Sequence, residues 1–521
     1  MNKLLLRKLM IATVLIPLLL QIYALPTIAK QNEKTVLTIA TSWPLKTLNP
    51  SKGGGYQLLR YGIGETLIAV DPSGKLVPSL AMSWQVKEDG KTWIIKLRED
   101  AFFHDSSKVN AQEVAKYLRK AFNEYTGLKL APIEEISYED EHTLVIKTTV
   151  PFAPLPAYLA YYESVILSPN SFNEKGELVS IIATGPYKLI SWEPMKDAVL
   201  ERFEKHWKGQ AKIPKVILKS IPDPNARIPL ILAGEVDIAQ LLPPQSIEAI
   251  SKNPQVEIIK YPITRTRILQ LNCYKSPFND KKARLAIQYA IDRETIDKYV
   301  FNDLWIPAGT LFPPMLFWAD NELRPYPYNP EKALSLLKEA GYKDTDGDGI
   351  LENVKTGEKL KVKFITYSER AELPIIAEVI QNQLAKIGFN VDLKVVSVNS
   401  LSEFWESGDF DILLIARGTY FLPDPDFIMM TDFYSNRNEK AGWGAYGWKN
   451  EKLDQLLEEG RRSFDLSKRL TIYKEAQRII YEESPVICID YYTNIDAVRK
   501  GIKNYHGHIS EYSFNLEEIE K

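Results

Sequence analysis

The stretch "GETLIAVDPSGKLVPSLAMSWQVKEDGKTWIIKLREDAFFHDSSKVNAQEV" runs from Gly64 to Val114 and mixes two structural patterns. In it, "KTWIIKLRE" alternates apolar and polar residues, as a half-buried strand does, and "DPSGK" and "EDGK" are turn signals. The next run, Ala111 to Phe122, has apolar residues at helical spacing, and Asn110 is suited to cap it. A further alternating strand follows in "HTLVIKTTV", His142 to Val150. This region is therefore expected to be α+β, with strands outnumbering helices.

From about Asp280 the pattern changes to amphipathic helices separated by short apolar strands. This alternation is typical of an α/β domain. Helices are expected in 280–301, 329–342, 372–389, 450–462 and 466–484, and strands in 361–367, 391–398 and 410–416.

Length and charge limit the possible classes of protein. A chain of 521 residues is too long for one ordinary core and predicts two or three domains. A formal net charge of -2 removes the main electrostatic argument for nucleic-acid binding.

The N-terminus has the features of a targeting segment. Lys3, Arg7 and Lys8 precede the apolar run "LMIATVLIPLLLQIYAL", and Thr27-Ile28-Ala29 offers a cleavage point. We therefore expect a signal peptide over residues 1–29. No later run reaches the roughly 18 apolar residues of a membrane span. The mature chain is expected to be exported and soluble, in a periplasm or secreted.

The chain has two cysteines, Cys273 and Cys488, both in apolar, strand-like surroundings. Two buried free thiols are the simpler interpretation. A disulfide between them is the alternative in an oxidising compartment, because the sequence does not show how close they lie. Neither is near the signal peptide, so lipid attachment to an N-terminal cysteine is not expected.

Four stretches in order resemble the peptide/nickel family of bacterial extracytoplasmic solute-binding proteins, which feed ABC importers. They are the opening stretch, "ATGPYKLISWEP" with "HWKG", "LNCYKSPFNDKKARLAIQYAIDRE" and "YNPEKALSLLKEAGYKDTDGDGI". The resemblance implies a two-lobed α/β fold of the periplasmic-binding-protein class II, with hinge crossovers and an extra α+β domain inserted in the first lobe. It places the first lobe at 33–69, 185–272 and 495–521, the additional domain at 70–184 and the second lobe at 273–494.

Two clusters could hold a metal ion. In "DTDGDGILE", Asp344, Asp346 and Asp348 match calcium-loop positions, but the twelfth position is Lys355, where a bidentate glutamate is needed. An acidic surface turn is the better interpretation. His506 and His508 would share one face of a strand, but two ligands make an incomplete site.

No sequence motif identifies a catalytic site. The chain has no HExxH, CxxC, Walker-type or G-x-S-x-G motif. We therefore expect neither an enzyme nor a bound cofactor. A structural or adhesive protein is also disfavoured, because nothing repeats.

The cargo is open between nickel or a metal chelate and a short or modified peptide. "SWPLKTLNP" and the terminal "EYSFNLEEI" resemble the nickel-type proteins. In "ARGTYFLPDPDF", Ala416 to Phe427, Phe421 stands where the peptide-binding proteins have an aspartate for the peptide's ammonium. The nickel-type aromatic residues of this loop are replaced by Thr419 and Pro423, and no histidine aligns for a direct metal bond.

The same resemblance selects a set of cleft residues. Aromatic side chains would stack on the cargo, Arg417 would pair with a carboxylate and Asp424 with a cation. Tyr56 ends "SKGGGY", a segment expected to form a turn after the strand "TVLTIATS". The chain is expected to act as a monomer that delivers small-molecule cargo to ABC permease subunits. The predicted ligand-binding residues are Tyr56, Tyr161, Tyr162, Tyr367, Arg417, Tyr420, Phe421 and Asp424.

Overall fold

The computed structural model describes residues 35–521, except 42–44, 46, 302–303 and 436–442. The predicted signal peptide, residues 1–29, lies outside these residues. Among the described helices, none combines the length and apolarity that crossing a membrane would require.

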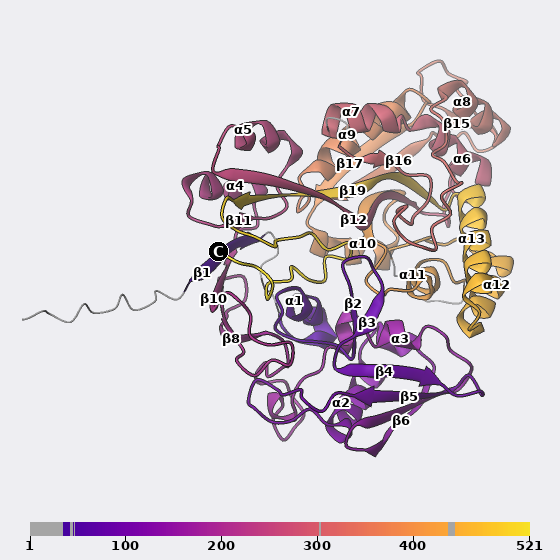
Figure 1. The fold of residues 1–521 in the computed structure, drawn as a ribbon. Helices are drawn as coiled ribbons and strands as arrows, with labels where there is room; N and C mark the ends of the chain where they lie inside the picture. The colour runs from indigo at the N-terminus through magenta and orange to yellow at the C-terminus, as the bar shows by residue number, and fades with distance from the viewer. Residues whose placement is uncertain (1–34, 42–44, 46, 302–303, 436–442) are drawn as a thin grey trace, which may run out of the picture.

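One large mixed sheet forms the centre of the molecule (Figure 1). From one edge to the other its order is β17-β16-β18-β12-β19-β11-β1-β10-β9-β8, with β13 (Ile306–Pro307) paired to β19. The strands are β17 (Asn390–Val396), β16 (Lys361–Tyr367), β18 (Ile412–Gly418), β12 (Val256–Leu271), β19 (Val486–Arg499), β11 (Ile238–Ala239), β1 (Val36–Thr41), β10 (Lys215–Ser220), β9 (Ala198–Arg202) and β8 (Tyr187–Ser191).

Two long strands join the halves of this sheet. β12 and β19 pair with each other along most of their length, with a register shift between Pro262 and Thr266. Beyond this point β12 pairs with β18, whereas the far end of β19 pairs with β11. We call the half with β1 and β8 to β11 the first lobe, and the half with β16 to β18 the second lobe. The chain's last residue, Lys521, donates to the Val36 carbonyl at 2.7 Å, so the C-terminus returns to the first lobe.

Helices flank each lobe. The first lobe carries α1 (Gly54–Arg60), α4 (Pro224–Ala233) and α5 (Ile247–Ser251). The second carries α6 (Lys281–Ala290), α7 (Arg293–Phe301), α8 (Pro330–Glu339), α9 (Glu372–Ala385), α10 (Leu401–Ser407), α11 (Pro425–Asp432), α12 (Glu451–Arg462) and α13 (Leu466–Glu483). Every predicted helix of this region is present. The run 280–301 is nevertheless two helices, because Asp292 accepts the backbone N–H and the hydroxyl of Thr295 and so starts a second helix.

A smaller unit, residues 81–164, lies beside the large sheet. Its antiparallel strands have the order β4 (Ala81–Val86), β5 (Thr92–Leu97), β7 (Thr143–Thr148), β6 (Ile133–Asp140), and α2 (Ala111–Glu124) packs on them. Asn110 caps α2 by accepting from the Glu113 N–H at 2.9 Å, as the sequence predicts. The short α3 (Leu155–Tyr158) ends the unit. The domain limits expected at residues 70, 185, 273 and 495 stay predictions.

The glycine-rich segment 51–56 is not a simple turn. Gly53 adopts φ 83°, and α1 begins at the next residue. A Cβ at Gly54 would lie 2.3 Å from the Leu48 carbonyl carbon, and one at Gly55 would lie 2.1 Å from the Tyr162 carbonyl oxygen. These glycines let α1 approach neighbouring backbone, and this contact places Tyr56 beside Tyr162.

Candidate functional site

The carboxyl ends of parallel strands identify a cleft between the lobes. β1 runs parallel to β10 and β11 in the first lobe, and β16 runs parallel to β17 and β18 in the second. In α/β sheets, ligands bind outside the carboxyl ends of such strands. The residues that follow β11, β16 and β18 are therefore the first candidates for contact with a cargo.

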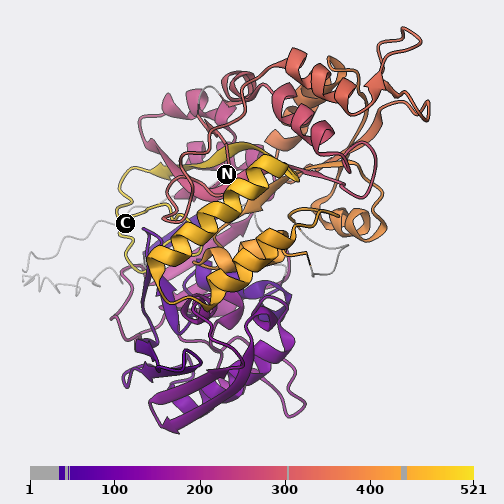
Figure 2. The same ribbon diagram turned by 90° about the vertical axis from the view of Figure 1, so that its right-hand side faces the viewer.

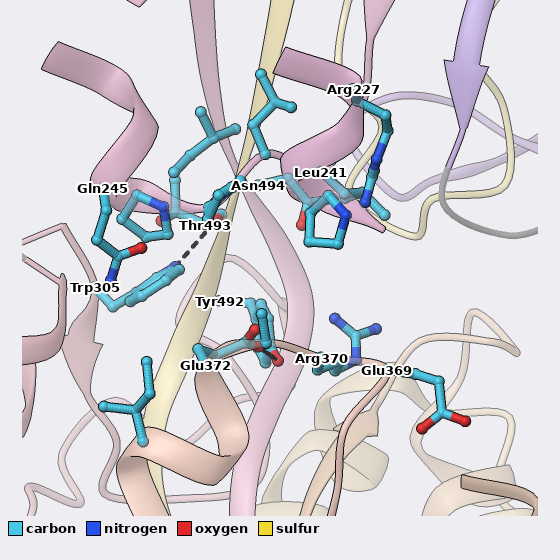
Figure 3. A pocket seen from close by; sticks show the side chains of 17 residues that line it. Arg227, Leu241, Gln245, Trp305, Glu369, Arg370, Glu372, Tyr492, Thr493 and Asn494 are labelled. Carbon is cyan, nitrogen blue, oxygen red and sulfur yellow. Dashed lines mark hydrogen bonds between the residues drawn. The ribbon is translucent and has the colours of Figure 1, made fainter. Parts of the chain in front are cut away.

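A pocket of about 90 Å³ occupies one part of this cleft (Figure 3). Arg227 and Leu241 of the first lobe lie on one side, Arg370 and Glu372 of the second lobe on the other, and β19 lies between them. A water molecule needs roughly 10–15 Å³ on this measure, so the pocket has room for several waters or a small organic group. Its polar and charged lining consists of Arg227, Gln245, Glu369, Arg370, Glu372, Tyr492, Thr493 and Asn494.

An aromatic cluster lies at the boundary between the lobes. Tyr56 of α1 lies edge-on to Tyr162 at 5.9 Å, to Tyr512 of the C-terminal segment at 5.7 Å and to Phe421 at 6.0 Å between ring centroids. Tyr162 also meets Phe421 at 6.3 Å and Tyr512 at 6.1 Å. We call these four residues the interlobe aromatic cluster. Phe421 follows β18, so the cluster joins the second lobe to the first.

A buried ion pair connects the cluster to the pocket. Arg265 of β12 donates to Glu511 Oε2 at 2.8 Å, and its guanidinium lies 5.6 Å from the Phe421 ring centroid. Asn494, which lines the pocket, donates to Glu511 Oε1 at 3.3 Å. Burial alone would raise the pKa of Glu511, but Arg265, together with Arg60 and Arg370, lowers it to about 2. Glu511 is thus an anion in the cleft at neutral pH.

A second ionic group forms the wall beside Arg370. Arg267 of β12 donates to Asp490 and, at 3.1 Å, to Glu372 Oε1. The Tyr492 hydroxyl also donates to this Glu372 oxygen. The guanidinium of Arg267 lies 3.5 Å from the Tyr492 ring centroid. This wall holds opposite charges at fixed positions, as a site for a charged solute requires.

Three of the predicted ligand-binding residues, Tyr56, Tyr162 and Phe421, belong to the interlobe aromatic cluster. Tyr161 lies next to it, with its ring 4.3 Å from that of Tyr162 and 5.0 Å from that of Phe427. Tyr367 is buried at the carboxyl end of β16. Tyr420 points away from the cluster: it stacks on Trp318 at 5.4 Å and donates to the Gly74 carbonyl.

The two charged residues predicted in the loop, Arg417 and Asp424, have partners within the chain. Arg417 is not in a loop: β18 extends to Gly418, beyond the predicted strand. Its Nε and Nη2 donate to the two carboxylate oxygens of Asp432 at 2.7 and 2.8 Å. Asp424 caps α11 and accepts from Arg469 at 2.8 Å. Their contacts with a cargo remain predictions, in competition with these partners.

The acidic loop at 344–348 pairs with a lysine. Asp344, Asp346 and Asp348 bring their carboxylate oxygens within 4.8 Å of one another. The ammonium of Lys359 lies 2.7 Å from Asp346 and also contacts Asp348. A lysine therefore supplies positive charge to this turn.

The structure also shows the surroundings of His508 and of the two cysteines. His508 lies in a loop, where it is buried, with Nδ1 2.7 Å from the Ser510 hydroxyl and Nε2 3.3 Å from the Val70 carbonyl. Cys273 and Cys488 are both buried and free.

Several cleft residues were not predicted from the sequence, among them Arg265, Arg370, Glu372, Tyr512 and Glu511. Arg370 and Glu372 carried a usable signal, because "SERAE" directly follows the predicted strand "KVKFITY". The rule that ligands bind outside the carboxyl ends of parallel strands would have selected both residues. Glu511 and Tyr512 open the terminal stretch "EYSFNLEEI", but no local pattern placed them beside Arg265 and Tyr56, because only the folded chain brings the C-terminal segment there.

Glu163 adjoins Tyr162 and gives a testable pH dependence. It is buried, and Oε2 accepts from the Gly127 and Leu128 amides at 2.9 and 3.3 Å. Burial raises its pKa to about 7 despite these hydrogen bonds. Since its pKa in the unfolded chain is about 4.3, its contribution to stability is present below that pH and is lost as the pH rises to about 7.

We expect this titration to lower the melting temperature of the parent as the pH rises from about 4.3 to 7. Glu163→Gln cannot titrate and should not show this decrease. Thermal unfolding across this range measures the effect. The exposed control Glu139→Gln should keep the parent profile. If the melting temperature of Glu163→Gln changed with pH in the same way as that of the parent, this expectation would be contradicted.

Comparison with known proteins shows which family the chain belongs to. The model of the bacterial extracellular solute-binding proteins, family 5, matches residues 75–440. The chain belongs to this family. Its members are extracytoplasmic and deliver peptide or nickel-chelate cargo to ABC permeases. Membership therefore points to a role in binding.

Relatives within the family differ in cargo. The chain is 27% identical over 514 residues to Di/tripeptide-binding protein 2 of Pseudomonas aeruginosa, covering 92% of this chain and 93% of that protein. NikA from Brucella suis, solved in complex with Fe(III)-EDTA, superposes with a TM-score of 0.83 at 24% identity, covering 93% and 99% of the two chains. NikZ from Campylobacter jejuni, solved in complex with Ni(L-His), gives 0.81 at 25% identity, covering 94% and 100%.

Proposed function

We propose that this ABC-importer binding protein captures nickel, or a similar metal ion, as a carboxylate chelate in the interlobe cleft. The main support for this proposal is that the acidic residues just after β18 already have cationic partners. Segment 419–432 contains three acids, and each meets an arginine: Asp424 meets Arg469, Asp426 meets Arg461 and Asp432 meets Arg417. A free peptide ammonium would have to compete with a guanidinium for each of these carboxylates.

The pocket presents two cationic side chains to an anionic cargo. Arg227 and Arg370 line it from opposite lobes, and guanidinium groups match carboxylates in geometry and charge. The interlobe aromatic cluster would pack on the organic part of a chelator. No described histidine lines this pocket or belongs to this cluster. The metal ion would therefore arrive with its own ligands.

A short peptide is the second candidate. Di/tripeptide-binding protein 2, at 27% identity, favours it. So do Glu511 and Glu372, two cleft carboxylates that could receive an ammonium in place of their present arginine partners.

Analysis of the ligand that co-purifies with the mature protein tests this choice. The chain would be expressed with residues 1–29, which we propose to be its export signal, and purified gently from the exported fraction. Native mass spectrometry with elemental analysis should find a transition metal together with an organic acid. A metal-free peptide mass would overturn the chelate proposal in favour of the peptide.

An empty preparation is assayed by thermal shift with nickel plus L-histidine and, separately, with a di- and tripeptide mixture. A ligand at about 100 times its Kd stabilises by about 2.7 kcal/mol. A shift with the peptides alone would likewise overturn the chelate proposal.

A further inference from the structure

The second lobe touches the small unit through a buried ion pair that lies outside the cleft residues described above. Arg461 lies in the last turn of α12, and its Nε and Nη2 lie 3.1 and 3.2 Å from the two carboxylate oxygens of Asp426 in α11. The Asp426 side chain is 0% exposed and that of Arg461 is 11% exposed. Figures 1 and 2 show α11 and α12 reaching toward the small unit at residues 81–164.

The small unit makes three hydrogen bonds to these two residues, two of them to the ion-paired side chains and one to the Arg461 backbone. The Tyr158 hydroxyl donates to Asp426 Oδ2 at 3.1 Å. Arg461 Nη2 donates to the Leu130 carbonyl at 3.1 Å, and the Ala153 N–H donates to the Arg461 carbonyl at 2.9 Å. The Arg461 guanidinium also lies 5.1 Å from the Phe152 ring centroid. A buried ion pair needs such additional hydrogen bonds to offset the cost of its desolvation.

The small unit is itself attached to the first lobe. The chain enters it after α1 and leaves it toward β8, and these two connections are bonded where the Gly185 N–H donates to the Ile63 carbonyl at 3.1 Å. His104 of the unit also lies with Nε2 3.0 Å from the Gly185 carbonyl. A contact between the small unit and the second lobe therefore holds the two lobes together.

We propose that Tyr158, Asp426 and Arg461 form a latch that stabilises the closed arrangement of the lobes before cargo binds. None of the three lines the interlobe pocket or belongs to the aromatic cluster, so the latch can form with the cleft empty. Closure costs less when protein contacts supply part of its free energy, and a cargo then binds more tightly to the same cleft. The effect on affinity rests on the proposed function, whereas the lobe equilibrium does not.

Tyr158→Phe is the appropriate variant, because it removes one hydrogen bond to a buried carboxylate and keeps the ring. The ring's packing on Phe152 at 5.3 Å and on Phe427 at 6.4 Å is retained, so the variant should fold. A hydrogen bond to a charged group contributes enough to change an equilibrium about tenfold. We expect the closed-to-open ratio of the cargo-free protein to fall by about that factor. Tyr138→Phe, at a 44% exposed tyrosine of the same unit, is the matched control.

Pulsed electron–electron resonance measures this ratio without any cargo. Spin labels are attached at Met82→Cys in the small unit and Leu466→Cys in the second lobe, both at exposed positions. The protein is freed of co-purified small molecules by unfolding and refolding. The parent and Tyr138→Phe should show a short-distance population that Tyr158→Phe largely loses. A parent that is wholly open, or a Tyr158→Phe distribution equal to the parent's, would overturn the latch. Neither outcome depends on which cargo the protein carries.

Discussion

Tyr162→Ala should weaken cargo binding by about 10- to 150-fold, because Tyr162 touches every other ring of the interlobe aromatic cluster. Burying a large apolar side chain contributes about 1.5–3 kcal/mol, and each 1.4 kcal/mol is a tenfold change in Kd. Part of this free energy is gained only on closure, because Phe421 is on the opposite lobe. Isothermal titration calorimetry with the identified cargo measures the loss.

The control for Tyr162→Ala is Tyr299→Ala. Tyr299 is 74% exposed on α7. Its removal should change neither the affinity for cargo nor the melting temperature of the cargo-free protein by more than the measurement error. If Tyr162→Ala bound cargo as the parent does, the aromatic cluster would be a packing contact between the lobes and the cargo would lie elsewhere.

Arg265→Met should destabilise the folded protein by about 3–5 kcal/mol, since it removes the closest cation of Glu511 while that carboxylate stays buried. Arg60 is the next cation, with its Nη2 3.8 Å from Glu511 Oε1. The pKa of Glu511 lies below its unfolded value, so its stabilisation is present above about pH 4.3 and is lost as the pH falls toward 2. Removing Arg265 raises the folded-state pKa of Glu511, so Arg265→Met should lose less stability than the parent as the pH falls from about 4.3 toward 2. Urea unfolding at several pH values measures both effects.

The double variant Arg265→Met with Glu511→Gln should recover only part of this loss, because it removes the unpaired carboxylate but leaves the buried Arg60 without its carboxylate partner. Arg462→Met is the surface control. Its ion pair with Glu458 joins residues four apart on the surface of α12. Losing this pair should lower the free energy of unfolding by less than about 1 kcal/mol. Equal costs for Arg265→Met and Arg462→Met would show that the Arg265–Glu511 pair contributes no more than a surface pair.

Local patterns predicted most of the helices and strands. Asn110 caps α2 as expected, and α8, α9, α12 and α13 lie within the predicted helical runs. These elements depend on residues three or four positions apart, and a single sequence contains that information. The single helix predicted over 280–301 was wrong for an equally local reason, since the side chain of Asp292 takes the N–H that would continue it.

The cleft was predicted only in part. The sequence singled out the loop after β18 by its composition, and its Phe421 meets Tyr56 and Tyr162 across the lobes. Arg417 and Asp424 were assigned to a cargo. In the structure Arg417 lies in β18 and pairs with Asp432 of α11, whereas Asp424 caps α11 and pairs with Arg469. Whether a charge is available for a ligand depends on its neighbours in space, which periodicity does not report.

By itself, the sequence determined the class of protein, the approximate positions of many of its helices and strands, and a family resemblance that the comparisons confirm. Tertiary structure alone decided which side chains share the cleft. Glu511 meets Arg265 across 246 residues of chain, and Tyr158 meets Asp426 across 268. Such pairs form because β12 and β19 cross between the lobes and the C-terminal segment returns to the first. Contacts of this length depend on the whole fold and leave no periodic trace in the sequence.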